Sequence, residues 1–261
     1  MYRPIGRSAR KLLSVMTAAA TCVTLAGVAG ATASSAAVAC SAWQAMQVSG
    51  ADGQQYVVRN KPSINHNDEG MCLSDPGRQA GFTVTRSPGW AQSAKVRAYP
   101  YIGTGCFEGA CPAGGAGSMQ RAGSLGNYTV RWATVTPQKS GVWNASLDLW
   151  LGPHVGAGNS EIMIWLRYSK PPWWEGLYPT VKIDGAKWYV VPHTTAPGNY
   201  YLSFRRATPV ASAKLRIAPF MAAAKRLGAV RSSWLLWAVQ AGFEIWSGGK
   251  GLAITKFSVS Q

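Results

Sequence analysis

Acidic residues are scarce in this sequence. It contains ten Asp and Glu against 26 Lys and Arg in 261 residues, so its formal charge at pH 7 is +16. The basic residues are scattered and no nucleic-acid recognition motif accompanies them, which argues against a nucleic-acid partner. The three histidines lack the spacing of metal ligands, so we expect neither a catalytic metal nor a cofactor. No Gly-x-Ser-x-Gly elbow is present, which argues against an esterase.

Long apolar runs are also absent after the first 40 residues, so we expect no membrane span. The N-terminal residues have the order of a secretory signal peptide: four basic residues (Arg3, Arg7, Arg10 and Lys11), an apolar run from about Leu12, then small residues. Cleavage after Ala33 and cleavage after Ala39 both satisfy the small-residue rule. We therefore expect a signal peptide over 1–39 and a secreted, extracellular protein with one domain over 40–261.

Four cysteines remain outside the signal peptide: Cys40, Cys72, Cys106 and Cys111. Such residues form disulfides in an oxidising compartment, and four of them allow three pairings. The short stretch from Cys106 to Cys111 suits a tight loop closed by a disulfide, so we predict the pairs Cys106–Cys111 and Cys40–Cys72. An alternative for Cys40 is a lipidated N-terminus.

The chain alternates short runs rich in Val, Tyr, Trp, Thr and Ile with clusters of Gly, Pro, Ser and Asn. This pattern predicts an all-β sandwich or barrel, which we expect to be monomeric. Only Pro219 to Leu227 has helical start and stop signals. The predicted strands are 55–60, 82–86, 94–99, 127–134, 142–151, 160–168, 180–183, 186–191, 199–206, 233–246 and 251–259.

Three of these strands combine an aliphatic face with an acidic one, because side chains alternate between the faces of a strand. Leu147, Leu149, Ile162, Ile164 and Phe243 belong to the aliphatic faces, which we expect to be buried against a second sheet. The opposite faces each carry an acid and a tryptophan, and we predict that they line a substrate cleft. Their members are Asn144, Ser146, Asp148 and Trp150; Glu161, Met163 and Trp165; and Gly242, Glu244 and Trp246.

Such a face suits carbohydrate chemistry. The flat apolar surface of tryptophan can lie against the C–H face of a pyranose ring. Hydrolysis of a glycosidic bond needs one proton donor and one nucleophile or base, which two carboxylic acids provide. A separation of roughly 5 to 5.5 Å between them gives retention of configuration, and a wider one gives inversion. The pattern predicts Glu161 and Glu244 as this pair.

These motifs closely resemble glycoside hydrolase family 12 over roughly Cys40 to Gln261. The matching stretches are Asp148-Leu149-Trp150-Leu151, Glu161 to Leu166, Gln240 to Trp246 with Gly248 to Leu252, and Tyr99-Pro100 before Gly105-Cys106 to Cys111. The resemblance implies a concanavalin-like β-jelly-roll sandwich of two antiparallel sheets with one short helix. It also implies a retaining endo-β-1,4-glucanase acting on cellulose-like, mixed-linkage or xyloglucan chains.

The resemblance also assigns roles to individual residues. Glu161 resembles the nucleophile, Glu244 the acid/base, and Asp148 the aspartate that contacts the nucleophile. We expect contacts with the β-glucan substrate from Asn60, Asn144, Trp150, Met163, Trp165 and Trp246.

One departure lies near the N-terminus. Many family members have Asn-Asn-x-Trp-Gly there, with a tryptophan that stacks on a sugar, where this chain has Arg59 to Ile64 without that ring. The loop Lys170 to Gly176 carries two tryptophans that either replace it at the cleft edge or cap the sandwich. A non-catalytic carbohydrate-binding or cell-wall-associated jelly-roll protein is the alternative function, and a basic protein that binds acidic polymers is a third.

Overall fold

The computed structural model describes residues 37–62, 70–77, 79–89, 91, 93–113, 115, 119–138, 140–156, 160–169, 178–196 and 199–261. Residues Ser35–Gln261 form one compact unit. The predicted signal peptide over 1–39 falls almost wholly outside the described residues, and the tryptophan-bearing loop Lys170 to Gly176 wholly outside them. No helix in the described part of the chain has both the length and the apolar character needed to span a bilayer.

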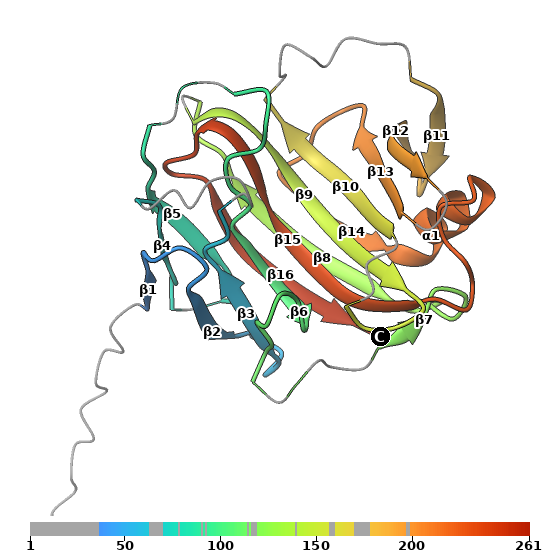
Figure 1. Cartoon of the computed structure of the whole chain (residues 1–261), viewed down its shortest axis with the longest axis horizontal. Coiled ribbons are helices and arrows are strands. Elements are labelled where there is room, and N and C mark those ends of the chain that lie inside the picture. Colours follow the sequence, from blue (N-terminus) through green and yellow to red (C-terminus); the bar gives the residue numbers. More distant parts are fainter. Residues whose placement is uncertain are drawn as a thin grey trace, which may run out of the picture. The chain divides into compact units, whose positions relative to one another are not determined.

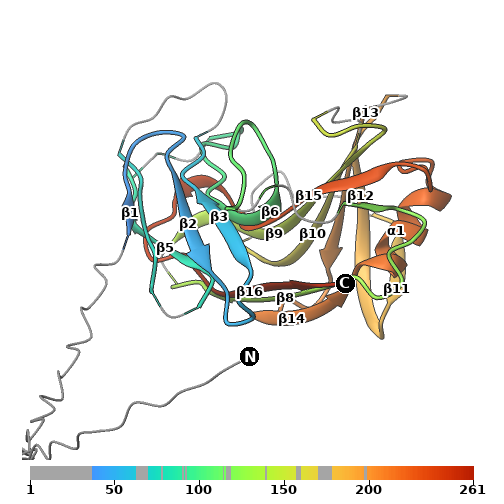
Figure 2. The same cartoon turned by 90° about the horizontal axis from the view of Figure 1, so that it is seen from below.

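Two β-sheets pack face to face, as the edge-on view in Figure 2 shows, and the expected β-sandwich is confirmed. The smaller sheet has the order β1 (Val38–Ala39), β4 (Cys72–Ser74), β5 (Phe82–Arg86), β16 (Ala253–Ser260), β8 (Thr129–Val135) and β14 (Ser212–Arg216). The larger sheet has the order β11 (Thr180–Ile183), β12 (Ala186–Ala196), β13 (Asn199–Arg206), β10 (Ser160–Tyr168), β9 (Gly141–Gly152), β15 (Leu235–Gly248), β6 (Tyr101–Gly105), β3 (Gln55–Arg59) and β2 (Ala45–Ser49), with β7 (Gln120–Arg121) paired to β15 (Figure 1).

Strands with strong alternation were predicted well. The predictions 82–86, 160–168, 180–183 and 199–206 coincide with β5, β10, β11 and β13. The prediction 94–99 is wrong as a strand, because only Ala98 forms isolated bridges, to Pro62 and Ile245. Strand β6 was not predicted, since its two glycines resemble a turn. Both are needed there: a Cβ on Gly103 would lie 2.7 Å from the Val239 carbonyl oxygen, and one on Gly105 2.1 Å from that of Trp237.

The core lies between the two sheets. The inner faces of β9, β10 and β15 are apolar, and Leu147, Leu149, Ile164 and Phe243 are each 0% exposed. Full burial of such a side chain stabilises the fold by roughly 1.5–3 kcal/mol. The pleat then turns every second residue of these strands away from the core. The acids predicted for the cleft therefore lie on the outer face of the larger sheet.

The predicted helix is confirmed as α1, Ile217–Arg226. Pro219 is tolerated in its first turn, where backbone N–H groups lack helical partners, and Gly228 follows the end of the helix with a φ of +75°. The ring of Phe220 packs edge-on against Trp188 of β12 and Phe204 of β13, with centroid distances of 5.0 and 5.4 Å. The helix thus covers the core side of these two strands.

One strand pair departs from the expected antiparallel sheets. Strand β13 runs parallel to β10, with Glu161 opposite Tyr201 and Trp165 opposite Arg205. The other pairs of named strands in the described chain are antiparallel. The parallel pairing is possible because β11 and β12 intervene in sequence between β10 and β13. It brings β13 beside the acid-bearing strand β10.

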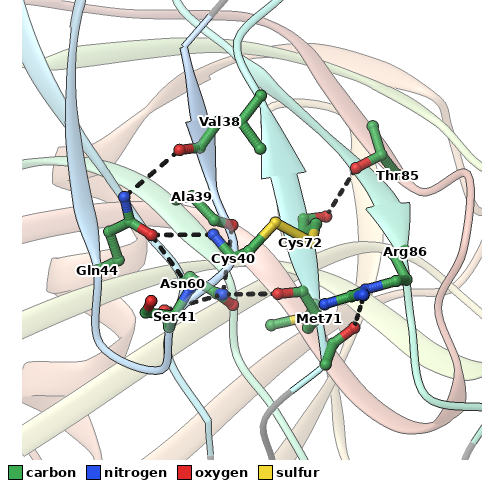
Figure 3. Close-up of a disulfide and its surroundings, with 11 residues drawn as sticks. Val38, Ala39, Cys40, Ser41, Gln44, Asn60, Met71, Cys72, Thr85 and Arg86 are labelled. Carbon is green, nitrogen blue, oxygen red and sulfur yellow. Dashed lines mark hydrogen bonds between the residues drawn. A yellow bond between two sulfur atoms is a disulfide. The ribbon is translucent and has the colours of Figure 1, made fainter.

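Both predicted disulfides are confirmed, Cys40–Cys72 and Cys106–Cys111. The first joins the residue after β1 to β4, as Figure 3 shows. A sulfur engaged in a disulfide cannot carry a thioether-linked lipid. The structure therefore favours the disulfide over lipidation at Cys40.

Candidate active site

Three neighbouring strands, β10, β9 and β15, present the predicted acids on one face. In the register, Asp148 of β9 lies opposite Met163 of β10 on one side and Gln240 of β15 on the other. Glu161 lies opposite Trp150, and Glu244 opposite Asn144. The two glutamates therefore flank β9 with Asp148 between them. We call this outer surface of β9, β10 and β15 the acid face.

The three carboxyls interact and are all poorly solvated. Asp148 is 2% exposed, whereas Glu161 and Glu244 are each partly exposed. Burial, followed by the charges of Asp148 and Glu244, raises the pKa of Glu161 well above its usual value. Burial and the Asp148 charge raise the pKa of Glu244 to about 8. Carboxyls in this setting hold protons near neutral pH, which suits acid and base catalysis.

Asp148 has a mixed environment. Burial raises its pKa to about 7, although interactions with the Ser146 and Tyr99 hydroxyls, the Lys61 charge and the Glu161 carboxyl oppose that rise. Its Oδ1 atom is buried without a hydrogen-bond partner. An incompletely satisfied buried carboxyl is costly to stability and is typical of a functional site.

Gly242 explains how Tyr99 reaches Asp148. A Cβ on Gly242 would lie 2.5 Å from the Pro100 carbonyl oxygen and 2.9 Å from the Tyr99 ring. The backbone of Tyr99 is held by its own N–H, which donates to the Lys61 carbonyl at 2.8 Å. The glycine between Gln240 and Glu244 therefore makes room for a tyrosine over the acid face.

Asn144 supports Glu244 rather than facing a substrate. It is 0% exposed, its Nδ2 donates to Glu244 Oε2, and its Oδ1 accepts from the Glu244 backbone N–H at 3.2 Å. These contacts argue against the predicted direct substrate contact, because both ends of the Asn144 amide already bond to Glu244. The same contacts identify Glu244 Oε2 as a hydrogen-bond acceptor.

Trp150 is the predicted tryptophan with an accessible ring. It is partly exposed, and its Nε1 donates to Gln240 Oε1 at 3.0 Å. Phe107 and Trp237 pack beside it, with ring centroids 4.6 and 6.2 Å away. This aromatic cluster lies on the Glu161 side of the acid face, where a sugar ring can stack.

The tryptophans on the Glu244 side are buried. Trp165 and Trp246 are 2% and 5% exposed, and their centroids lie 6.3 Å apart. The Arg205 guanidinium carbon lies 4.1 Å from the Trp165 ring centroid, and Met163 is 0% exposed beneath Tyr201. This burial argues against the predicted substrate contacts of Met163, Trp165 and Trp246, because their side chains pack against protein.

Asn60 has a structural role as well. It is 2% exposed, and its Nδ2 lies within hydrogen-bond distance of the carbonyls of Met71 (2.9 Å), Ser41 (3.2 Å) and Ala39 (3.4 Å), around the Cys40–Cys72 disulfide (Figure 3). These contacts argue against the predicted substrate contact, because the backbone carbonyls already use the amide nitrogen. Sequence could not reveal this, since the partners come from two separate segments, 39–41 and Met71.

Lys61 occupies the segment that lacks the family's tryptophan. Its Nζ lies 3.2 Å from Glu108 Oε1 and 4.5 Å from the Phe107 ring centroid. Its charge lowers the pKa of both Asp148 and Glu161 against the effect of burial. This end of the acid face therefore carries a cation over an aromatic ring.

Three further residues near Glu244 were not predicted: Tyr201, His193 and Arg205. The Tyr201 hydroxyl lies 3.5 Å from Glu244 Oε1. The His193 ring stacks on Tyr201, and Arg205 contacts His193. The signal was available, because Tyr201, Ser203 and Arg205 alternate with the core residues Leu202 and Phe204 in a correctly predicted strand. Within the described ranges, no cluster of three His, Cys, Asp or Glu side chains is arranged to hold a metal ion.

Comparisons with known proteins agree with this site. The model of glycosyl hydrolase family 12 matches residues 123–261, which include all three acids. The "Probable cellulase Cel12b" of Mycobacterium tuberculosis (strain ATCC 25618 / H37Rv) is 30% identical over 124 residues, 46% of this chain and 81% of that protein.

Solved structures extend the likeness to most of the chain. Endoglucanase cel12A from Rhodothermus marinus superposes with a TM-score of 0.74 at 33% identity, covering 86% of this chain and 98% of its own. A metagenome-derived glycoside hydrolase family 12 endoglucanase gives a TM-score of 0.73 at 32% identity, covering 86% and 97%. This chain therefore belongs to glycosyl hydrolase family 12 and is a glycoside hydrolase.

Proposed function

We propose that this protein is a secreted, retaining endo-β-1,4-glucanase. The observation that carries the proposal is the grouping of Glu161, Asp148 and Glu244 on one face of three adjacent strands, close enough to shift one another's pKa. Relatives described as cellulase and endoglucanase support a β-glucan substrate. We further propose that 1–39 is a signal peptide and that 40–261 is the catalytic domain.

The reaction proceeds in two displacements. In the first, a carboxylate oxygen of Glu161 bonds to the anomeric carbon while the glycosidic C–O bond breaks, and Glu244 gives its proton to the leaving oxygen. In the second, Glu244 takes a proton from water, whose oxygen displaces Glu161 from the anomeric carbon. Glu244 is thereby reprotonated and Glu161 is restored as a carboxylate, with net retention of configuration.

Asp148 and Trp150 assist this chemistry in different ways. Asp148 is the nearest carboxyl to the nucleophile in the register, and its interaction with Glu161 orients that side chain. Trp150 offers a partly exposed ring on the same face, two residues further along β9. A glucan chain lying across the acid face would contact this ring and both glutamates.

The direct test measures new reducing ends from carboxymethylcellulose, mixed-linkage β-glucan and xyloglucan. We expect release by the native protein and a loss of at least about 10³-fold in Glu161→Gln, because the amide cannot act as the nucleophile. Asp184→Asn is the matched control, since it makes the same acid-to-amide change at an exposed turn where Asp184 pairs with Arg216.

Proton NMR of the first products tests the stereochemistry. Initial formation of the β-anomer supports retention, and initial formation of the α-anomer would replace the double displacement with a single one. Release of no reducing ends from any of the three polymers, with retained binding to them, would favour a non-catalytic carbohydrate-binding protein.

A further inference from the structure

Strand β13 adds a polar edge to the acid face. Its parallel pairing with β10 sets Tyr201 beside Glu161, Ser203 beside Met163 and Arg205 beside Trp165. The alternate residues Leu202 and Phe204 are buried in the core. Ser203 is 0% and Arg205 6% exposed. Burying polar side chains costs free energy unless they gain hydrogen-bond partners, so the partners of these two residues indicate what this edge does.

The contacts of Glu244 distinguish its two oxygens. Oε2 accepts from Asn144 Nδ2, whose orientation is fixed because Asn144 Oδ1 accepts from the Glu244 backbone N–H. A donor at Oε2 leaves Oε1 as the oxygen that carries the proton when Glu244 is neutral. The Tyr201 hydroxyl lies 3.5 Å from that oxygen.

Tyr201 can serve both protonation states of Glu244. Its hydroxyl also lies 3.0 Å from Met163 Sδ, which accepts hydrogen bonds but cannot donate one. With Glu244 neutral, Oε1–H donates to the tyrosine oxygen while the tyrosine donates to Met163. With Glu244 ionised, the tyrosine O–H turns to Oε1. Burial and the neighbouring carboxylates raise the pKa of Tyr201 well above its usual value, so the hydroxyl keeps its proton throughout.

His193 and Arg205 hold the tyrosine from behind. The His193 ring stacks on Tyr201 with centroids 4.1 Å apart and planes at 19°, although one edge of the imidazole stays exposed. His193 Nε2 lies 3.0 Å from Ser203 Oγ and 3.3 Å from Arg205 Nη2. A guanidinium can only donate, so Nε2 accepts and the ring is neutral. Burial and the Arg205 charge lower the pKa of His193 to about 4, in agreement with this geometry.

Arg205 is itself fixed. Its Nε donates to Ser203 Oγ at 3.0 Å, and its guanidinium stacks on Trp165. The charged groups that act on Glu244 are Asp148 from β9, which raises the pKa of Glu244, and Arg205 from β13, which lowers it; Glu161 of β10 interacts with Glu244 as well. Arg205 thus contributes a positive charge to a site of three carboxyls.

We propose that Tyr201 is a positioning residue that holds the proton of Glu244 on Oε1 and exchanges its hydrogen bond between Met163 and Glu244 as that proton leaves and returns. His193, Ser203 and Arg205 keep the tyrosine in place. The inference rests on the proposed function for the role of Glu244 as acid and base. The contacts of Tyr201 and its effect on the Glu244 proton do not depend on turnover.

The test compares Tyr201→Phe with Tyr200→Phe. Both changes remove one hydroxyl, but Tyr200 packs against the core on the other face of β13 and makes no contact with Glu244. In Tyr201→Phe both forms of Glu244 lose a hydrogen bond, but the bond to the ionised form is the stronger one. The pKa of Glu244 therefore rises and the basic limb of kcat/KM moves to higher pH. We expect kcat to fall about tenfold, the effect of one hydrogen bond to a charged group. Tyr200→Phe should leave both unchanged.

A measurement without substrate separates this inference from the proposed function. The sequence has five glutamates, so protein labelled with ¹³C at the glutamate carboxyl gives few signals, and Glu244→Gln identifies that of Glu244. Its titration should move to higher pH in Tyr201→Phe and in Arg205→Met. An unchanged titration and an unchanged pH profile in Tyr201→Phe would overturn the inference, whether or not the native protein hydrolyses glucan. Hydrolysis lost in Glu161→Gln would still support the proposed function.

Discussion

The two faces of β9, β10 and β15 are built from alternate residues of the same strands, yet they have opposite characters. The inner face consists of side chains such as Leu149, Ile164 and Phe243, each 0% exposed and apolar. The outer face buries Asp148 and Gln240 almost as completely, with Asp148 Oδ1 and Gln240 Nε2 lacking hydrogen-bond partners. The inner side of the sheet supplies stability, and the outer side, where we propose that the chemistry takes place, gives part of it up.

The largest difference between the two faces should appear in the hydrolytic activity of Glu244→Gln, a variant that removes the proposed proton donor but keeps the shape of the acid face. We expect hydrolysis of mixed-linkage β-glucan to fall about 10²–10⁴-fold, the usual contribution of a general acid/base. An aryl glycoside with an acidic leaving group should lose much less in the first displacement, because its leaving oxygen needs little protonation. Pre-steady-state release of the aryl alcohol measures this, and equal losses on both substrates would contradict the assignment.

The inner face should respond in stability instead. Leu149→Ala deletes buried methyl groups one residue away from Asp148, and we expect the free energy of unfolding to fall by about 2–5 kcal/mol. Denaturant unfolding measures the loss. Activity per folded molecule should change little below the unfolding midpoint. A large fall in kcat without a fall in stability would show that the two faces are not separable in this way.

Asp148→Asn should move the pH dependence. The Asp148 charge raises the pKa of both Glu161 and Glu244, so its removal lowers both. The proposed mechanism requires Glu161 to be ionised and Glu244 to be protonated in the free enzyme, so both limbs of kcat/KM should move to lower pH, the basic one from near 8. The profile of kcat/KM between pH 4 and 10 tests this. Limbs that stay in place, or move upward, would show that Asp148 does not act on the pair through its charge.

The smallest effect is expected at the partly exposed ring of the outer face. Trp150→Leu keeps an apolar side chain but removes the flat surface for a sugar. Aromatic stacking contributes about 0.5–1.5 kcal/mol, so we expect KM for glucan to rise about 2- to 12-fold with kcat nearly unchanged. Thermal unfolding of the variant serves as the control for packing with Phe107. An unchanged KM would mean that the substrate does not contact Trp150.

Sequence reasoning assigned the acids to one face but did not identify the protein partners of several neighbouring residues. The period of two in β9, β10 and β15 was sufficient to assign Asp148, Glu161 and Glu244 to one face, since that depends only on the pleat. It could not tell which polar residues would be used by protein partners. Asn144 is engaged by Glu244, Asn60 by three backbone carbonyls, and Trp165 by Arg205. Each of those partners lies far away in the chain or on a different strand.

The amino-acid sequence by itself determined the alternation of the strands, the helix α1 and both disulfides. It also determined that the three acids lie on one face of their strands. These features follow from local periodicity, turn residues and cysteine spacing. Only the tertiary structure decided the parallel pairing of β13 with β10, the burial of Trp165 and Trp246, and the placement of Tyr201, His193 and Arg205 behind Glu244. Which strands become neighbours depends on burying apolar surface over the whole chain, and the pKa of each acid depends on the neighbours that this packing provides.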